Sequence, residues 1–389
     1  MALVGAITMI CLNGKLARNT RRAAILTLFV MVLPVMLVML GFSVDMAYMQ
    51  LVQSEMRLAS DNVARIAADN LSSFENESQA IAKGKEVAEQ FTVAGKPLRL
   101  NSSDFDFGRA VAGLSGEFAF DTNGFPPNAV RVSAARNSAN PDGAVPLFFS
   151  RLVSNQTFSP QVSATASFVN VDICLVLDRS TSMKFTVTST ESGMSINDRR
   201  FCKAPPSNSR WASLDSAVKV FTGVLNSNTS DEQVSIVTFG SDLNSIMPGL
   251  CGRMPNATID MQLSTNISAA DSTINTLSNS VWNGNTEIAS GILLGTQELT
   301  SARSRRLSDK VMIVLTDGYP TAGDAVAAAT AAAAQKVVVY AITFGPDGDQ
   351  NHMQQVAAAG NGEHAHAADE ATLKDIFRRF AAKATILVQ

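Results

Sequence analysis

The pattern of apolar and polar positions begins with a long uninterrupted apolar run near the N-terminus. Between Ala23 and Val44 no charged residue interrupts a stretch rich in Leu, Val, Met and Ile. A helix of about 20 apolar residues crosses the roughly 30 Å hydrocarbon core of a bilayer. We therefore predict a transmembrane helix over residues 23–44. The weaker apolar stretch from Leu3 to Leu12 is too short to span a membrane, and we expect it to be unstructured.

Beyond this run, hydrophobic residues recur at alternating steps of three and four, which is the spacing of one helical face. We expect the helix to continue over residues 45–72, standing up from the membrane with an apolar stripe. The stripe could pack against the chain's own next domain or against a helix of another subunit, and the spacing favours neither. Its members are Met49, Val52, Met56, Ala59, Val63 and Ile66.

The next region, residues 73–169, has the pattern of a small β-rich module. Short β-like runs alternate with Gly, Pro and Asn, which is typical of strands joined by turns. The runs are Phe105–Phe107, Phe118–Phe120, Val130–Val132, Val145–Phe149 and Val162–Val169.

The remaining residues, 170–389, alternate continuous apolar runs with amphipathic segments. Continuous apolar strands between helices are typical of a parallel sheet covered on both faces. We therefore predict an α/β domain built on a doubly wound, mostly parallel, Rossmann-like sheet. The predicted strands are Val171–Leu177, Val234–Phe239, Lys310–Thr316 and Val337–Thr343, and the predicted helices are Trp211–Leu225, Glu287–Leu299, Ala325–Gln335, His352–Ala359 and Ala371–Lys383.

Charged residues on either side of the first apolar run predict its orientation. Asp45 follows the run directly, and four basic residues precede it: Lys15, Arg18, Arg21 and Arg22. The positive-inside rule places residues 1–22 in the cytoplasm and everything after about residue 45 across the membrane. A cleaved secretory signal is the alternative, but it needs a shorter apolar region and a small-residue cleavage site, and the sequence has neither.

The overall charge and the absence of catalytic motifs narrow the function. The formal net charge is -3 and the pI is about 5.7, so nothing suggests a nucleic-acid partner. No Gly-x-Ser-x-Gly elbow, His-Glu-x-x-His helix or phosphate-binding Gly loop occurs, and we predict that the protein is not an enzyme. His364 and His366 form a His-x-His pair, but zinc needs more ligands than this, and we expect a surface strand end there.

The cysteines fit a chain that lies mainly in an oxidising compartment. Cys11 lies on the predicted cytoplasmic side and Cys174 in a predicted buried strand, so we expect both to be free. Cys202 and Cys251 lie in polar loops of the predicted exported part, and we predict that a disulfide links them. Two unpaired thiols are the alternative. The bridge would hold the insert Lys184–Arg210 as a rim beside the strand ends. The alternative is that this insert is a solvent-exposed loop without a role at the site.

Oxygen-bearing side chains gather at the carboxyl ends of the predicted strands, the edge where parallel sheets bind ligands. The first strand runs into Asp178-Arg179-Ser180-Thr181-Ser182, and the strand that ends at Thr316 is followed by Asp317. Thr286 lies on a Gly-bearing turn that opens a helix. Hard cations such as Mg²⁺ prefer oxygen ligands and retain waters. Three hydroxyls and two carboxylates could hold such an ion and leave room for a ligand's carboxylate.

The set Asp178-x-Ser180-x-Ser182, Thr286 and Asp317 resembles the metal ion-dependent adhesion site of von Willebrand factor A (VWA) domains in residue type, order and strand context. The resemblance covers roughly residues 170–385. It implies that the hydroxyls bind Mg²⁺, Mn²⁺ or Ca²⁺ directly, that the two carboxylates act directly or through water, and that a protein ligand completes the sphere with a carboxylate.

The N-terminal half resembles a second family, the TadG-like proteins of tight-adherence (Flp) pilus systems. The similarity lies in Arg21-Arg22-Ala23-Ala24, Leu33-Pro34 and Ser43-Val44-Asp45, and in the later runs Asn128–Val132, Val145–Phe149 and Val162–Ala166. One departure is that no Glu follows the basic residues, where pilin-type precursors often carry one. The resemblance implies a single-pass protein of the bacterial inner membrane, with its bulk periplasmic or extracellular.

These features together predict a membrane-anchored VWA protein that works in tight-adherence pilus assembly or in adhesion, with pilus or envelope proteins as partners. A periplasmic structural or sensory scaffold, which recruits envelope partners without any pilus, is the alternative.

Overall fold

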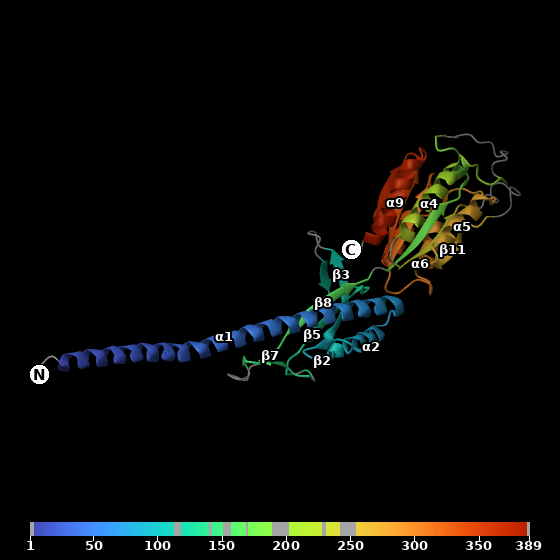
Figure 1. Cartoon of the computed structure of the whole chain (residues 1–389). Coiled ribbons are helices and arrows are strands. Elements are labelled where there is room, and N and C mark those ends of the chain that lie inside the picture. Colours follow the sequence, from blue (N-terminus) through green and yellow to red (C-terminus); the bar gives the residue numbers. More distant parts are fainter. Residues whose placement is uncertain are drawn as a thin grey trace. The chain divides into compact units, whose positions relative to one another are not determined.

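The computed structural model describes residues 4–112, 118–138, 140, 142–150, 157–168, 170–188, 202–227, 231–241 and 254–386. The chain divides into two compact units (Figure 1). The N-terminal unit comprises Met1–Ala67, Ser78–Asp106 and Val130–Ala166, and the C-terminal unit comprises Ala68–Glu77, Phe107–Ala129 and Ser167–Gln389.

A single long helix, α1 (Val4–Phe74), contains both the apolar run and the amphipathic stretch that follows it. The window of highest hydropathy within Leu26–Phe74 is long and apolar enough to cross a membrane, and only 6% of it is buried. Pro34 lies inside the helix without ending it. The expectation of an unstructured lead was wrong, because α1 already begins at Val4. The stretch Leu3–Leu12 contains no proline that would interrupt a helix.

The apolar stripe of α1 packs within its own unit, which decides between the two alternatives that the spacing left open. Val52, Met56, Ala59 and Val63 have no exposed surface. The backbone N–H of Ala94 donates to Glu55 Oε2 at 2.9 Å, which fixes one turn of the module to the helix. The two ends of the stripe are less covered, since Met49 is half-buried and Ile66 is 37% exposed.

The β-rich region contains more elements than the pattern predicted. It contains a sheet of four strands in the order β4-β3-β5-β8 and two sheets of two strands, β1-β2 and β6-β7. A helix, α2, was missed because its stretch is short and polar. The elements are α2 (Glu77–Ala88), β1 (Thr92–Val93), β2 (Lys96–Pro97), η1 (Ser102–Asp104), β3 (Phe105–Ala112), β4 (Phe118–Asp121), β5 (Ala129–Ala135), β6 (Val145–Pro146), β7 (Thr157–Phe158) and β8 (Gln161–Ser167).

The predicted strand Val145–Phe149 is a strand only in β6 (Val145–Pro146). The N–H groups of Phe148 and Phe149 donate to the Asp45 carboxylate on α1 instead of to a neighbouring strand. The loop is therefore held by a side chain from a distant part of the sequence.

The C-terminal unit is a doubly wound α/β fold, as predicted. Its sheet has the order β11-β10-β9-β12-β13-β14, and every pairing is parallel except that of β10 with β11. The strands are β9 (Asn170–Asp178), β10 (Asp231–Phe239), β11 (Ala257–Ser264), β12 (Asp309–Thr316), β13 (Val337–Phe344) and β14 (Asn361–Ala367).

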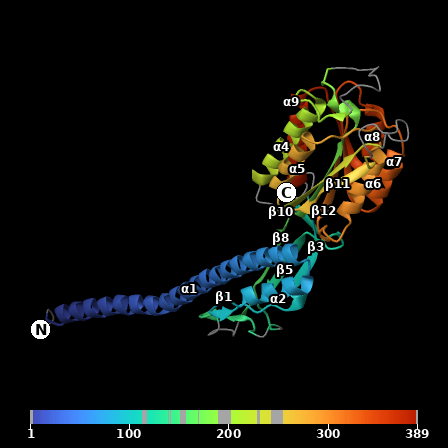
Figure 2. The same ribbon diagram turned by 90° about the vertical axis from the view of Figure 1, so that its right-hand side faces the viewer.

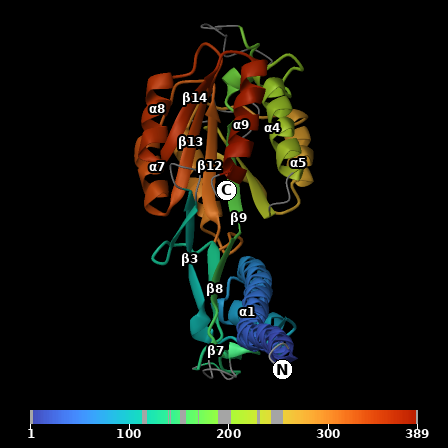
Figure 3. The same ribbon diagram turned by 60° about the vertical axis from the view of Figure 1, so that its left-hand side comes forward.

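Helices cover both faces of this sheet, and each face has its own hydrophobic core. Figures 2 and 3 show α4, α5 and α9 on one side of the strands and α6, α7 and α8 on the other. The helices are η2 (Thr181–Lys184), α4 (Arg210–Ser227), α5 (Ser268–Ser278), α6 (Ile288–Leu299), α7 (Ala325–Ala334), α8 (Gln350–Ala359) and α9 (Glu370–Ile386). Because β9 is central and buried along its whole length, the residue that ends it lies in the middle of the carboxyl edge.

Two glycines let α6 approach the sheet closely. A Cβ at Gly291 would lie 2.8 Å from Val176 Cγ1 and from Phe239 Cδ1, and one at Gly295 would lie 2.9 Å from Val176 Cγ2. Since real Cβ atoms do not approach this closely, the helix depends on glycine at its contact face. The approach brings the start of α6 toward the carboxyl edge.

We expect Gly291→Ala to destabilise the C-terminal unit by about 1–3 kcal/mol, because it overpacks this contact. The control is Gly223→Ala in α4, where an added Cβ meets nothing within 4 Å. That change should stabilise by about 0.5–1 kcal/mol, since alanine has less freedom to lose on folding. Urea unfolding followed by tryptophan fluorescence measures both, because the chain's two tryptophans, Trp211 and Trp282, are buried in this unit. Equal effects of the two substitutions would contradict the packing argument.

Candidate functional site

The two predicted carboxylates follow neighbouring strands of the C-terminal sheet. Asp178 is the last residue of β9, and Asp317 comes directly after β12, which pairs with β9 in parallel. The hydroxyl of Thr316 donates to Asp178 Oδ2 at 2.6 Å, so the two strand ends are also joined by a side-chain hydrogen bond. Both aspartates have no exposed surface.

The serines form a tight turn after β9 that points their hydroxyls at Asp317. The N–H of Ser180 donates to Asp178 Oδ1 at 2.7 Å, which closes the turn. The Oγ atoms of Ser180 and Ser182 are 2.9 Å apart, and Ser182 Oγ donates to Asp317 Oδ1 at 2.7 Å. One chain of hydrogen bonds thus runs from the first strand end to the second.

Thr286 reaches this group from a third loop. The backbone N–H and the hydroxyl of Thr181 both donate to Gly284 O, at 2.9 and 3.1 Å, which fixes that loop against the serine turn. A Cβ at Gly318 would lie 3.1 Å from Thr286 Oγ1 and 3.7 Å from Ser182 Oγ. Thr286 Oγ1 and Ser182 Oγ therefore both lie close to Gly318, the residue after Asp317, so the three predicted loops meet at this edge. That they bind a cation stays a prediction.

Burial leaves the two carboxylates poorly compensated. Burial, together with the nearby Asp317 carboxylate, raises the pKa of Asp178 to about 7, although hydrogen bonds from Ser180 and Thr316 work in the opposite direction. Burial also raises the pKa of Asp317 above its usual value, although Arg210 works in the opposite direction. Buried carboxylates beside three hydroxyls form a donor set that suits a hard dication, because the ion supplies the missing positive charge.

A cation at this edge would depend on hydroxyl ligands. Within the described residues there is no group of three or more His, Cys, Asp or Glu side chains that could hold a metal. His364 Nε2 and His366 Nδ1 each lie 3.0 Å from Thr343 Oγ1, so the His-x-His pair on β14 contacts a neighbouring strand of its own sheet.

Arg210, the first residue of α4, is a site residue that the sequence reasoning missed. Its fully buried guanidinium donates to Asp317 Oδ2 through Nη1 at 2.7 Å and to Asp347 Oδ2 through Nη2 at 2.6 Å. A signal was present, because Arg210 lies at helical spacing with Leu214 and Ala217 on the face that α4 buries. A charged residue on a buried face needs a buried partner of opposite charge.

The cysteines are only partly described. Cys174 is free and buried, as predicted, and burial raises the pKa of its thiol to about 12. Cys202 is disulfide-bonded, whereas its predicted partner, Cys251, lies outside the described residues. The pairing of Cys202 with Cys251 stays a prediction.

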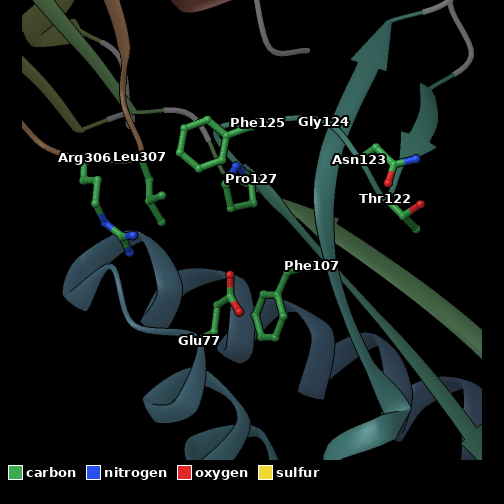
Figure 4. Close-up of a pocket in the computed structure, with 9 residues that line it drawn as sticks. All are labelled: Glu77, Phe107, Thr122, Asn123, Gly124, Phe125, Pro127, Arg306 and Leu307. Carbon is green, nitrogen blue, oxygen red and sulfur yellow. The ribbon is translucent and has the colours of Figure 1, made fainter.

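Two pockets of the C-terminal unit contain none of the five predicted residues. One of about 210 Å³, drawn in Figure 4, is lined by Glu77, Phe107, Thr122, Asn123, Gly124, Phe125, Pro127, Arg306 and Leu307. A smaller one, of about 140 Å³, is lined in part by Arg179, Asp260 and Trp282. The cluster at the strand ends is therefore a set of converging oxygens and not one of these two cavities.

Several solved structures are similar to this chain at low identity. An aerotolerance-related membrane protein from Bacteroides fragilis NCTC 9343 is 16% identical, with a TM-score of 0.40 over 55% of this chain and 99% of that one. The pilus adhesin SpaC from Lactobacillus rhamnosus GG is 15% identical, with a TM-score of 0.42 over 71% of this chain and 39% of that one.

A third solved structure has a metal in its site. Proximal thread matrix protein 1 from the mussel byssus, described with a zinc-occupied MIDAS motif, is 17% identical, with a TM-score of 0.39 over 57% of this chain and 46% of that one. A comparison with curated proteins found no significant match. At these identities and TM-scores, the three similarities carry no argument about this chain.

The model of the von Willebrand factor type A domain family matches residues 172–379, more than half of the chain. The match contains Asp178, Thr286, Asp317 and both serines of the turn. The expected N-terminal likeness to TadG-like proteins receives no support from these comparisons. On the family match and the fold, this chain belongs to the von Willebrand factor type A domain family.

Proposed function

We propose that this chain is a membrane-anchored, non-enzymatic protein whose VWA domain binds a protein ligand through a divalent cation. Asp178, Ser180, Ser182, Thr286 and Asp317 would hold the ion. The convergence of their oxygens on one buried spot at the strand ends is the observation that supports this most directly. The ion would supply positive charge and an open coordination position for the ligand's carboxylate.

The choice of cation follows from the chemistry of the donors. Hydroxyls and carboxylates are hard ligands, and no sulfur or imidazole ligand stands among the five predicted residues. Mg²⁺ fits such a set well, since it retains several waters and needs few protein carboxylates. Mn²⁺ and Ca²⁺ accept the same donors. Two carboxylates, one of them paired with Arg210, leave the ion electrophilic toward an acidic side chain.

The apolar part of α1 supports a membrane anchor. Large hydrophobic side chains from Leu26 to Val44 are 45–72% exposed, so the N-terminal unit does not cover them. Water disfavours such a surface, whereas a bilayer accommodates it. With the basic residues before the run, we place the N-terminus in the cytoplasm of a bacterial cell, the span in the inner membrane, and the VWA domain in the periplasm or outside the cell.

We favour a role in tight-adherence pilus assembly or adhesion, because motifs that resemble those of TadG-like proteins precede the VWA domain. The test is capture of partners by the full-length protein, solubilised from its own membranes, with Mg²⁺ and with a chelator. We expect Asp178→Ala to lose the partners that Mg²⁺ retains. Asp375→Ala, which removes a carboxylate that is 59% exposed on α9, is the matched control and should retain them.

The identity of the captured proteins separates the two candidate roles. Pilin and pilus-secretion proteins would support pilus assembly, whereas envelope proteins without any pilus component would support a structural or sensory scaffold. Equal capture by wild-type protein and Asp178→Ala, with and without Mg²⁺, would contradict a metal-dependent site.

We also propose the disulfide Cys202–Cys251. Peptide mass mapping without reductant should recover the two cysteines in one linked peptide, while Cys174 reacts with an alkylating agent only after unfolding. In the loop-entropy description, such a bridge stabilises by roughly 4 kcal/mol, so reduction should lower the unfolding temperature. Recovery of Cys251 as a free thiol would rule the bridge out.

A further inference from the structure

One loop of the N-terminal unit is held against α1 at the end of its apolar run. The Asp45 carboxylate, which is only 1% exposed, accepts hydrogen bonds from three successive backbone N–H groups. Phe148 N lies 2.9 Å from Oδ1, Phe149 N lies 3.1 Å from Oδ1, and Ser150 N lies 2.6 Å from Oδ2. The hydroxyl of Ser150 donates to Oδ2 as well, at 2.6 Å. Four donors on one carboxylate fix this loop to the helix.

The loop extends from Asp45 back along the helix, toward the apolar run. A Cβ placed on Gly41 would lie 2.9 Å from the Cβ and Cγ atoms of Phe149, so the Phe149 side chain lies directly on the helix backbone there. Gly41 precedes Asp45 by one helical turn, which is about 6 Å along the axis. The loop thus overlaps the last turn of the stretch that we assign to the membrane.

The two phenylalanines are packed on only one side. Phe148 is 60% exposed and Phe149 is 45% exposed. The Tyr48 ring meets the Phe148 ring edge-on, with 4.8 Å between their centroids. Phe42 and Val44, on the same part of the helix, are 62% and 46% exposed. Aromatic and apolar side chains of the loop and of the helix therefore lie at one level.

We infer that the loop Leu147–Ser150 is a lipid-contacting edge, which places the Phe148 and Phe149 side chains in the boundary between the hydrocarbon and the headgroups of the bilayer that α1 crosses. This rests on the membrane anchor proposed above. Aromatic side chains concentrate at this boundary in membrane proteins. The position of Phe149 on Gly41 selects lipid as the occupant, because a protein partner there would have to replace the bilayer around the helix.

This contact would hold the N-terminal unit flush with the membrane surface. A helix alone can tilt and rotate in the bilayer, whereas a second apolar contact beside it limits both motions. Asp45 makes the arrangement rigid, since its carboxylate satisfies three N–H groups that would otherwise need water. The N-terminal unit would then keep a fixed orientation on the membrane surface instead of moving freely about α1.

The test uses full-length protein in vesicles of phosphatidylcholine and phosphatidylglycerol that contain a doxyl-labelled lipid. A bimane fluorophore is attached at Phe148→Cys, in a Cys11→Ser background. The control is Lys96→Cys, an exposed position on β2 two residues after Ala94, whose N–H donates to Glu55. Glu55 lies ten residues beyond Asp45, about 15 Å farther along the helix, so this label should remain in water.

We expect the lipid to quench the fluorophore at position 148 and to leave the one at position 96 unquenched. Absence of quenching at both positions, in protein that floats with the vesicles, would overturn the lipid contact and leave the membrane anchor intact. Protein that does not float would overturn the anchor and the lipid contact together.

A second substitution tests the docking of the loop itself. Gly41→Leu keeps the helix apolar but places a side chain where Phe149 lies, so it should reduce quenching at position 148. Val38→Leu, at a position that is 63% exposed, is the matched control and should leave quenching unchanged. Undiminished quenching in Gly41→Leu protein would overturn the part of the inference in which the contact of Phe149 with Gly41 positions the loop.

Discussion

Replacing Asp178 with asparagine is expected to stabilise the metal-free VWA domain near neutral pH and to abolish its stabilisation by Mg²⁺. Asp178 has no exposed surface, and burial raises its pKa to about 7. Without a cation, folding therefore places an unfavourable negative charge beside that of Asp317. Asparagine keeps an oxygen for the N–H of Ser180 but carries no charge.

The direction of the pH dependence follows from this raised pKa. In the unfolded chain the carboxyl loses its proton near pH 4, whereas in the fold it keeps the proton up to about pH 7. Between these values the folded state binds more protons, so wild-type stability should fall as the pH rises from 4 to 7 and level off above. The loss has an upper bound of about 4 kcal/mol, from the shift of roughly three pH units. An asparagine side chain cannot titrate, so the fall should be smaller in the Asp178→Asn variant, in which Asp317 alone of the two carboxyls keeps a raised pKa.

Mg²⁺ should reverse the effect in wild-type protein only. At a free concentration about 100 times its dissociation constant, a ligand of the native state stabilises by about 3 kcal/mol. Thermal unfolding of full-length protein, followed by the fluorescence of Trp211 and Trp282, reports on this unit alone. Asp375→Asn on α9 is the control and should behave as wild type. Identical pH profiles and identical Mg²⁺ responses for wild type and Asp178→Asn would refute the site.

The central elements of the VWA domain could be predicted because burial leaves a strong mark on their sequences. Every residue of β9 is buried, and its pattern is an apolar run that ends in Asp178. The carboxyl ends of parallel strands lie at one edge, so the candidate residues could be assembled from strand order alone. The fold then supplied the hydrogen bonds that join Asp178, the two serines and Asp317.

The edge strands were harder to predict, because each is half covered and carries polar residues. The first half of β11 is only partly buried, and β14 begins with alternating exposed and partly buried positions; neither strand has a continuous apolar run. The short loop after β6 was misread for a different reason. Its hydrogen-bond acceptor is Asp45, about a hundred positions earlier, and no local pattern reports a contact of that range.

Arg210 is a second residue whose contact could not be predicted from local sequence, because its partner is distant along the chain. It follows Asp178 by a long insert and precedes Asp317 by 107 positions, so the pairing is set by the docking of α4 on the sheet. Local sequence gives only the anomaly of a charged residue on a buried helix face. The partner could be identified only once the strand ends were in place.

Arg210→Met is expected to destabilise the VWA domain by about 3–5 kcal/mol, the usual effect of leaving one member of a buried ion pair alone. Both side chains of the pair, Arg210 and Asp317, are fully buried, and methionine fills much of the same volume without charge. Urea unfolding at pH 7.5 without divalent cations measures the change. The double variant Arg210→Met/Asp317→Asn removes both charges of this pair, so neither is left buried without a partner. Most of the lost stability should therefore return. If the double variant is as unstable as the single one, packing and not charge explains the loss.

The same substitution should strengthen the response to Mg²⁺. In wild-type protein, Arg210 Nη1 offsets the charge of Asp317, so a dication gains the attraction of little more than Asp178. With methionine in place of Arg210, no positive side chain offsets the charge of Asp317, so both carboxylates attract the ion. The variant without metal is also less stable than wild type, because its two carboxylates repel each other more strongly. Mg²⁺ should therefore raise the unfolding temperature of Arg210→Met by more than that of wild type, at equal free concentration. A smaller rise would mean that Arg210 orients Asp317 for the ion, and that its positive charge assists binding instead of opposing it.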